Sequence, residues 1–186
     1  DDGENMKTGL FFGTCTGNTE ELAEVIQDQL NIDESDVHDV AQASVNDLMA
    51  YEFLIVGIPT WHIGELQDDW YCLYEDLEKV DLSGKKIALF GLGDQYGYGD
   101  TFLDGMGILY KKMVERGAEG NIGFWPTEGY EFDASEAIVD GQFCGLAIDQ
   151  DCQSELTDER LEKWCDILKL QLQKIAAWKE YEDAQA

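Results

Sequence analysis

A polar segment near the N-terminus has the residue types of an anion-binding loop. Residues 13–19 contain three threonines, two glycines and an asparagine within seven positions. Threonine hydroxyls and the asparagine amide donate hydrogen bonds, and glycine lets a ligand approach the backbone closely. The segment follows the apolar residues 10–12 and precedes an amphipathic run from Leu22, which predicts a strand-to-helix turn. The free N–H groups and the positive dipole end of that helix favour a phosphate here.

The charges around this loop narrow the kind of phosphate. No Lys or Arg occurs between Lys7 and Lys79, so neutral donors must hold the anion unless a basic residue folds in from elsewhere. The loop lacks the lysine of the NTPase motif, and Glu21 stands six positions after the cysteine, where a tyrosine phosphatase has arginine. A monophosphate therefore fits better than a triphosphate. The alternative is a polar turn in which Asn18 caps the helix and Glu21 completes a capping box, but such a turn needs none of the threonines.

Two later loops each carry an aromatic ring among glycines and polar residues. Trp61 lies in residues 59–66, after the apolar run 53–58, and Tyr98 lies in residues 91–100, after the apolar run 86–91. The carboxyl ends of parallel strands meet at one edge of a sheet, where ligands bind. An aromatic ring in such a loop is suited to stacking on a flat ligand. A core position for Trp61 and a surface turn for Tyr98 are the alternatives.

The composition is that of one acidic globular domain. The chain has 186 residues, 44% of them hydrophobic, which is enough for a single core. It has no apolar run long enough to span a membrane and no signal-peptide pattern, so a soluble protein is expected. Twelve basic and 40 acidic residues give a net charge of −28, which argues against nucleic acid and anionic lipid as partners and favours basic protein faces; solubility in a salty habitat is the alternative explanation. The five cysteines form no Cys-x-x-Cys pair, which indicates a reducing compartment.

Strand and helix patterns alternate along the chain, which predicts an α/β fold with a parallel sheet covered by helices on both faces. The predicted strands are residues 8–12, 37–40, 53–58 ending at Pro59, 86–91, and a fifth that begins near 121–124 and resumes at 143–148. The predicted helices are residues 20–30, 45–50, 70–77 and 101–116, and a long last helix capped by Thr157. The polar segment 125–142 is predicted to be an insertion in the last strand. We expect a single domain over residues 1–186, with a core of about residues 7–178.

These loops resemble those of the flavodoxin family in its long-chain form. Residues 14–19 match the phosphate loop, Pro59-Thr60-Trp61 with Gly64-Glu65 match the second loop, and Gly93-Asp94-Gln95 with Tyr98 match the third. Residues 145–149 also match the family's late strand, so the similarity covers about residues 8–178. The resemblance implies a three-layer, doubly wound sheet of five parallel strands in the order 2-1-3-4-5.

The resemblance also implies non-covalently bound FMN, with its phosphate on residues 14–19 and its isoalloxazine ring between Trp61 and Tyr98. Backbone around His62 would face N5 of the ring, backbone near Gly93 would meet its pyrimidine edge, and the loop after residue 148 would approach its outer edge. The implied cofactor-binding residues are Thr14, Cys15, Thr16, Gly17, Asn18, Thr19, Pro59, Thr60, Trp61, His62, Ile63, Gly64, Leu92, Gly93, Asp94, Tyr98, Asp100, Thr101, Asp149 and Asp151. No catalytic residue and no metal ligand is expected.

Two of these positions differ from the usual family pattern. His62 stands where many members have Asn, and Cys15 stands where Ser is common. We favour an exposed, inert histidine over one that titrates near neutral pH and perturbs the flavin. For Cys15 we favour a small residue without special chemistry over a reactive thiol at a helix N-terminus.

The implied function is that of a low-potential one-electron carrier without substrate turnover of its own. It would shuttle electrons between redox proteins, for example photosystem I or a reductase and ferredoxin-NADP reductase, in the plastid stroma or the bacterial cytoplasm. We expect a monomer that binds the basic faces of these partners transiently. The residues agree with a low potential, because burial, the tyrosine face and negative charge without nearby Lys or Arg disfavour an anionic reduced flavin.

Two alternatives share this fold class. An FMN-dependent NAD(P)H:quinone reductase would need an uncovered ring face and a basic pocket for the dinucleotide, and neither is evident. A phosphoacceptor domain of the receiver type would need acidic residues after the first strand and a lysine after the fifth. Residues 12–14 and 124–126 provide neither.

Overall fold

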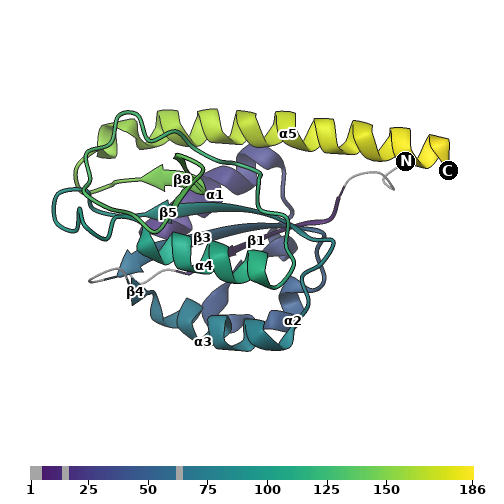
Figure 1. Cartoon of the computed structure of the whole chain (residues 1–186), viewed down its shortest axis with the longest axis horizontal. Coiled ribbons are helices and arrows are strands. Elements are labelled where there is room, and N and C mark those ends of the chain that lie inside the picture. Colours follow the sequence, from purple (N-terminus) through teal and green to yellow (C-terminus); the bar gives the residue numbers. More distant parts are fainter. Residues whose placement is uncertain (1–5, 14–16, 62–64) are drawn as a thin grey trace.

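The computed structural model describes residues 6–13, 17–61 and 65–186 as three layers, with a parallel sheet between two layers of helices (Figure 1). The parallel strands are β1 (Thr8–Phe12), β2 (Val37–Asp39), β3 (Phe53–Trp61), β5 (Lys86–Leu92) and β8 (Gly145–Ile148). They are ordered β2-β1-β3-β5-β8, and each neighbouring pair is parallel. The expected order 2-1-3-4-5 is therefore confirmed, with β5 and β8 as the fourth and fifth strands.

The helices are α1 (Asn18–Leu30), α2 (Val45–Leu48), α3 (Asp68–Asp76), α4 (Asp104–Glu115) and α5 (Thr157–Gln185). Short 3-10 turns occur at Glu34–Asp36, Val40–Gln42, Leu77–Lys79 and Ser154–Leu156. α1 and α5 cover one face of the sheet, and α3 and α4 cover the other (Figure 1). The far end of α5 projects beyond the sheet at the end where the chain enters β1 (Figure 1). No helix of the described residues is long and apolar enough to cross a membrane.

The central strands are buried because helices cover both faces of the sheet. In β3, residues 53–58 have no polar side chain and all are buried, as are residues 87–92 of β5. On the side of α5 that packs against the sheet, Leu161, Trp164 and Leu168 are also buried. A continuous apolar run is typical of a parallel strand covered on both sides.

The prediction that Pro59 ends the third strand is wrong, because β3 continues to Trp61. β1 pairs with β3 only as far as Gly57, so the strand beyond that point has no neighbour on the β1 side of the parallel ladder. Proline has no N–H to donate, and such a position tolerates it. The extension pairs with the short antiparallel strand β4 (Glu65–Leu66), with Thr60 opposite Leu66.

Several predicted helix starts also differ from the structure: α1 and α3 begin two residues before the predicted 20 and 70, at Asn18 and Asp68. The fourth helix begins at Asp104 rather than 101, because Leu103 has a left-handed φ of 59° that interrupts the helical path. Thr157 does not cap α5: it is the first helical residue, after the 3-10 turn Ser154–Leu156, and its hydroxyl donates to Gln150 Oε1 at 2.8 Å. The buried hydroxyl is thus satisfied by a neighbouring loop instead of by the helix N–H groups.

The insertion precedes the last strand, and the expected strand start at residues 121–124 is wrong. After α4, the chain meets β5 by a single parallel bridge between Glu119 and Lys86. It pairs with β5 again only along β8. In between, β6 (Ile138–Val139) and β7 (Gln142–Phe143) form an antiparallel hairpin. Its turn residues Asp140 and Gly141 both have positive φ, at 52° and 80°, as a two-residue hairpin turn requires.

Candidate functional site

The candidate site lies at the edge of the sheet where the parallel strands end. The loops that follow β1, β3, β5 and β8 all leave from this edge, which is at the left in Figure 1. β1 and β3 are also the pair at which the strand order reverses direction, since β2 lies to one side and β5 to the other. Ligands of open parallel sheets bind at such a point.

The first loop leads into α1 through a glycine. Gly17 is the N-cap and has a φ of 86°, a left-handed conformation that favours glycine. The capping-box alternative is wrong, because Asn18 is the first helical residue and Glu21 donates its backbone N–H to the Gly17 carbonyl at 3.1 Å. The N-cap thus offers no side chain to the first turn of α1, which suits an external anion there. Thr19 is buried, Asn18 is exposed, and Thr14, Cys15 and Thr16 lie outside the described residues.

A buried tryptophan packs against the start of this loop. Trp70 of α3 donates its indole N–H to the Gly57 carbonyl at 2.9 Å, and Gly13 donates its backbone N–H to the same carbonyl at 3.0 Å. A Cβ at position 13 would lie 2.6 Å from Trp70 Cδ1 and 2.4 Å from Gln67 Oε1, so only glycine fits there. Neither Trp70 nor Gln67 was predicted to matter for the site. In the sequence, Trp70 is only the first apolar residue of a predicted helix, and Gln67 is a polar residue before that helix.

The second loop begins at the end of β3. Pro59 and Thr60 are half-buried, and the Thr60 hydroxyl accepts a hydrogen bond from the Gly105 N–H at 3.2 Å. This contact ties the end of β3 to the start of α4. The backbone of Trp61 pairs with Glu65, while the Trp61 side chain and the residues His62, Ile63 and Gly64 lie outside the described part of the site.

The third loop is a turn built around Asp94. Its carboxylate accepts the backbone N–H groups of Tyr96 at 3.0 Å and Gly97 at 2.8 Å, and its carbonyl accepts the N–H of Tyr98 at 3.0 Å. The Gly97 N–H is the main reason that the pKa of Asp94 is lowered. The Tyr98 ring that follows is 46% exposed. A half-exposed ring on a well-anchored turn is available to stack on a flat ligand.

The other predicted residues of this loop lie around the turn. Leu92 is buried at the end of β5, and Gly93 donates its N–H to the Ile148 carbonyl at 3.0 Å. Asp100 is exposed. The hydroxyl of Thr101 is buried and has no hydrogen-bond partner among the described residues. Such an orphaned hydroxyl is expected where a bound ligand completes the hydrogen bonding.

The fourth loop follows β8 and contains Asp149, Asp151 and Cys152. The pKa of Asp151 is raised, mainly because its carboxyl is partly buried and also because the carboxylates of Asp94 and Asp149 are near. Burial is also the main cause that raises the pKa of Cys152 to about 11, so its thiol stays protonated at neutral pH and donates to Asp94 Oδ1 at 3.3 Å. This protonated thiol is a hydrogen-bond donor and not a nucleophile.

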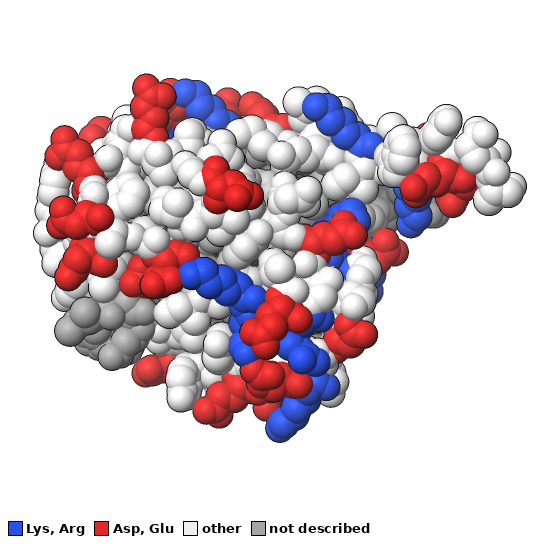
Figure 2. Space-filling model, viewed as in Figure 1, with Lys and Arg blue, Asp and Glu red and all other residues white. Residues whose placement is uncertain are grey.

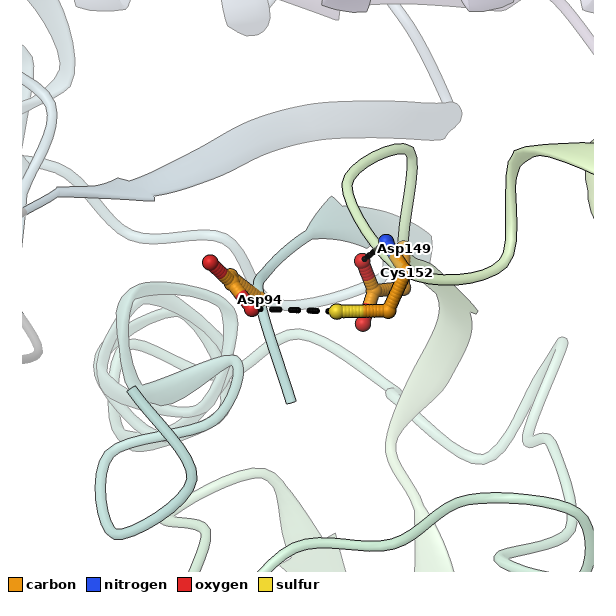
Figure 3. Close-up of side chains that lie close together, drawn as sticks. All are labelled: Asp94, Asp149 and Cys152. Atoms are coloured by element: carbon orange, nitrogen blue, oxygen red, sulfur yellow. Dashed lines mark hydrogen bonds between the residues drawn. The ribbon is translucent and has the colours of Figure 1, made fainter. Parts of the chain in front are cut away.

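Asp94, Asp149 and Cys152 form a cluster in which one carboxylate oxygen of each aspartate and the Cys152 Sγ lie within 4.8 Å of one another (Figure 3). The cluster resembles a metal site only in composition. Each oxygen of Asp149 accepts two N–H groups, and the Cys152 thiol donates to Asp94. These hydrogen bonds occupy the Asp149 lone pairs that a cation would need.

The whole edge is negatively charged. The loops of residues 13–17, 62–64, 93–103 and 149–156 and the insertion 125–142 contain no Lys or Arg. Lysines 7, 85 and 86 lie instead at the opposite ends of the strands. On the face shown in Figure 2, Asp and Glu occupy the end at which the strands finish, and most of the visible Lys and Arg lie away from it.

The residues present fit a ligand that joins one phosphate to a flat ring. The N-terminus of α1 suits the anion, and the half-exposed Tyr98 suits the ring. The unpartnered Thr101 hydroxyl is a further polar group that a ligand could satisfy. The loops themselves contain no Lys or Arg, which makes them a poor site for a triphosphate.

Known proteins resemble the chain over most of its length. The family model described as Flavodoxin matches residues 10–164. A flavodoxin of Nostoc sp. is 52% identical over 165 residues, which cover 89% of this chain and 96% of the relative. Flavodoxin 1 of Escherichia coli (strain K12) is 52% identical over 158 residues, which cover 84% and 89%. The crystal structure of a Fusobacterium nucleatum flavodoxin bound to flavin mononucleotide is 32% identical, covers 89% of this chain and 98% of that one, and superposes with a TM-score of 0.83.

Proposed function

The chain belongs to the flavodoxin family, and from that premise we propose that it is a low-potential, one-electron carrier that binds FMN non-covalently. It carries electrons between other redox proteins and turns over no substrate of its own. The observation that carries the proposal is the combination at one sheet edge of a helix N-terminus whose N-cap is a left-handed glycine and the half-exposed Tyr98. These two features suit the two ends of FMN, its phosphate and its isoalloxazine ring.

We assign the cofactor contacts to the loops at this edge. Residues 14–19 would hold the phosphate, with neutral donors and the start of α1. Residues 59–64 and Tyr98 would enclose the ring, and the backbone at 92–94 would meet its polar edge. When bound, FMN supplies the chemistry, because it takes up and releases electrons one at a time.

The protein's own contribution is to disfavour negative charge on the ring. Asp94, Asp100 and Asp151 lie on the loops around it, and none of these loops contains Lys or Arg. Negative groups near a partly buried ring raise the energy of its anionic form. The residues therefore lower the potential of the step that would add negative charge, which is what a donor of low-potential electrons needs.

The protein interacts transiently with redox partners, and we propose that it presents this acidic edge to their basic faces. Photosystem I or a reductase as donor and ferredoxin-NADP reductase as acceptor are the partners that we suggest, with the protein acting as a monomeric single domain. The ring edge would lie at the docking surface, so that electrons cross a short distance. A soluble compartment, either bacterial cytoplasm or plastid stroma, suits such partners.

Electron transfer to a basic one-electron acceptor tests this function. The FMN-loaded protein is reduced anaerobically and mixed in a stopped-flow instrument with a basic haem protein of the cytochrome c class. We expect one electron per flavin to pass rapidly at about 0.05 M salt, and the second-order rate constant to fall by about tenfold or more towards 0.5 M, as the Debye length shortens from ~14 to ~4 Å. No reduction of the haem would contradict the carrier function, whereas fast transfer with a flat salt profile would contradict only the electrostatic docking.

A further inference from the structure

Asp149 is a charged side chain with no exposure to solvent. It lies directly after β8, and its carboxylate accepts four N–H groups. The backbone N–H and the side-chain amide of Gln95 donate to Oδ2 at 2.9 and 2.8 Å, and the backbone N–H of Asp151 donates to Oδ1 at 3.0 Å. The backbone N–H of Cys152 also donates to Oδ1, at 2.9 Å (Figure 3). A buried carboxylate is stable only with such a set of donors. Its oxygens are thus engaged by the protein itself.

Gln95 extends this network to a third segment. It is 4% exposed, and its amide nitrogen also donates to Gln153 Oε1 at 2.9 Å. Its amide oxygen accepts the backbone N–H of Glu131, in the insertion, at 2.6 Å. One glutamine side chain therefore links the loop after β5, the loop after β8 and the insertion. Gln95 belongs to a motif of the third loop but was not predicted as a site residue.

The network holds the turn that presents Tyr98. Asp94 and Gln95 begin that turn, and Tyr98 is bonded back to the Asp94 carbonyl. Cys152 joins the two aspartates: its thiol donates to Asp94 Oδ1, and its backbone N–H donates to Asp149 Oδ1 (Figure 3). If Asp149 lost its donors, the turn would lose both hydrogen bonds that join Gln95 to the residue after β8. It would keep the bond from the Gly93 N–H to the Ile148 carbonyl and the bond from the Cys152 thiol to Asp94, so the loss would loosen the turn at Gln95.

We propose that Asp149 and Gln95 are positioning residues that fix the Tyr98 turn over the ring-binding site without contacting the ring themselves. The assignment rests on the proposed function for the identity of the ring, but the hydrogen-bond network does not. It gives Asp149 a different role from the cofactor contact expected from the sequence. The carboxylate acts through Gln95 on the loop and leaves contact with the ring to Tyr98.

The variant Asp149→Asn tests the proposal because it keeps the shape of the side chain. An amide NH2 would replace an oxygen that accepts two N–H groups, so two buried donors would lose their acceptor. We expect the protein to stay folded and the Kd for FMN to rise about three- to tenfold. The Kd for riboflavin should rise by the same factor, because the phosphate end is untouched. Amide exchange of Tyr98 in the protein as purified should become at least about tenfold faster.

Asp140→Asn is the matched control. It removes the same charge from an exposed side chain in the β6–β7 turn that makes no hydrogen bond to the described residues, and asparagine tolerates the positive φ of this position. We expect its flavin affinity and its Tyr98 exchange to stay within about twofold of the wild type. If Asp149→Asn behaves like this control, the positioning role is contradicted. It is also contradicted if FMN affinity falls while riboflavin affinity does not.

Gln95→Met provides a second variant if Asp149→Asn does not fold. It removes both polar atoms of the side chain but keeps the backbone N–H that donates to Asp149. We expect the same equal loss for FMN and riboflavin, by a smaller factor, and unchanged values would overturn the proposal. Failure of the wild type to bind FMN would contradict the proposed function instead, and the exchange of Tyr98 would still decide the role of the network.

Discussion

Replacing Trp70 by alanine is expected to lower the free energy of unfolding by about 3–5 kcal/mol, the usual cost of removing a large buried aromatic side chain. Trp70 has no exposed surface, and its indole N–H bonds the Gly57 carbonyl in the centre of the sheet. The ring also supports Gly13 at the start of the first loop. The change should therefore weaken FMN binding as well, and urea unfolding of the flavin-free proteins measures the stability.

The matched control is Trp178→Ala. Trp178 is 61% exposed on the part of α5 that projects beyond the sheet, and it stacks only on Tyr181 in the aromatic contacts described. We expect this variant to unfold within about 0.5 kcal/mol of the wild type. Trp70→Phe separates the indole hydrogen bond from the packing, and it should cost about 1–2 kcal/mol. A loss below 1 kcal/mol for Trp70→Ala would contradict the role given to this residue.

Replacing Tyr98 by alanine is expected to weaken FMN binding by about 1–3 kcal/mol, which is about 5- to 150-fold in Kd. The ring is half-exposed on a turn that Asp94 and the Asp149 network hold in place, so the wild-type protein loses little entropy when the ring stacks. Riboflavin should lose the same free energy as FMN, because the lost contact is to the ring. Fluorescence titration of flavin into the apoprotein gives both dissociation constants.

Tyr96→Ala is the control for this experiment. Tyr96 lies two residues earlier in the same turn and is 71% exposed, with its hydroxyl 3.5 Å from Glu131. Its removal should change the Kd for FMN by less than about threefold. If both tyrosine variants bind FMN as the wild type does, Tyr98 does not cover the ring. Trp61→Ala, titrated in the same way, tests the stacking residue that the resemblance places on the other face of the ring.

The sheet could be predicted because its strands are continuous apolar runs separated by helical patterns. Residues 8–12, 53–58 and 86–91 form strands as expected, and the order of the strands followed from the resemblance of the loops. The errors lie where tertiary contacts override a local rule. Pro59 continues its strand because β1 has already ended, and Leu103 delays α4 because its backbone is left-handed. Local propensity contains neither fact.

The candidate site shows the same division. Tyr98 was predicted because an aromatic ring in a glycine-rich loop is unusual, whereas Gln95 has no such signal, since a buried glutamine is indistinguishable in sequence from one on a surface turn. The role of Trp70 also depends on contacts with residues 13 and 57, which are distant in sequence. Thr14, Cys15, Thr16 and His62 lie outside the described residues, so their expected roles stay predictions.

The central claim is that the acidic edge holds FMN as a low-potential one-electron carrier, and a potentiometric titration of the FMN-loaded protein tests it most directly. Absorbance is followed anaerobically as the potential is lowered with a reductant and mediators. The account predicts two separate one-electron steps, with the second at a potential well below that of free FMN, because loops without Lys or Arg disfavour added negative charge. A single two-electron step, or a second step at or above the potential of free FMN, would contradict it.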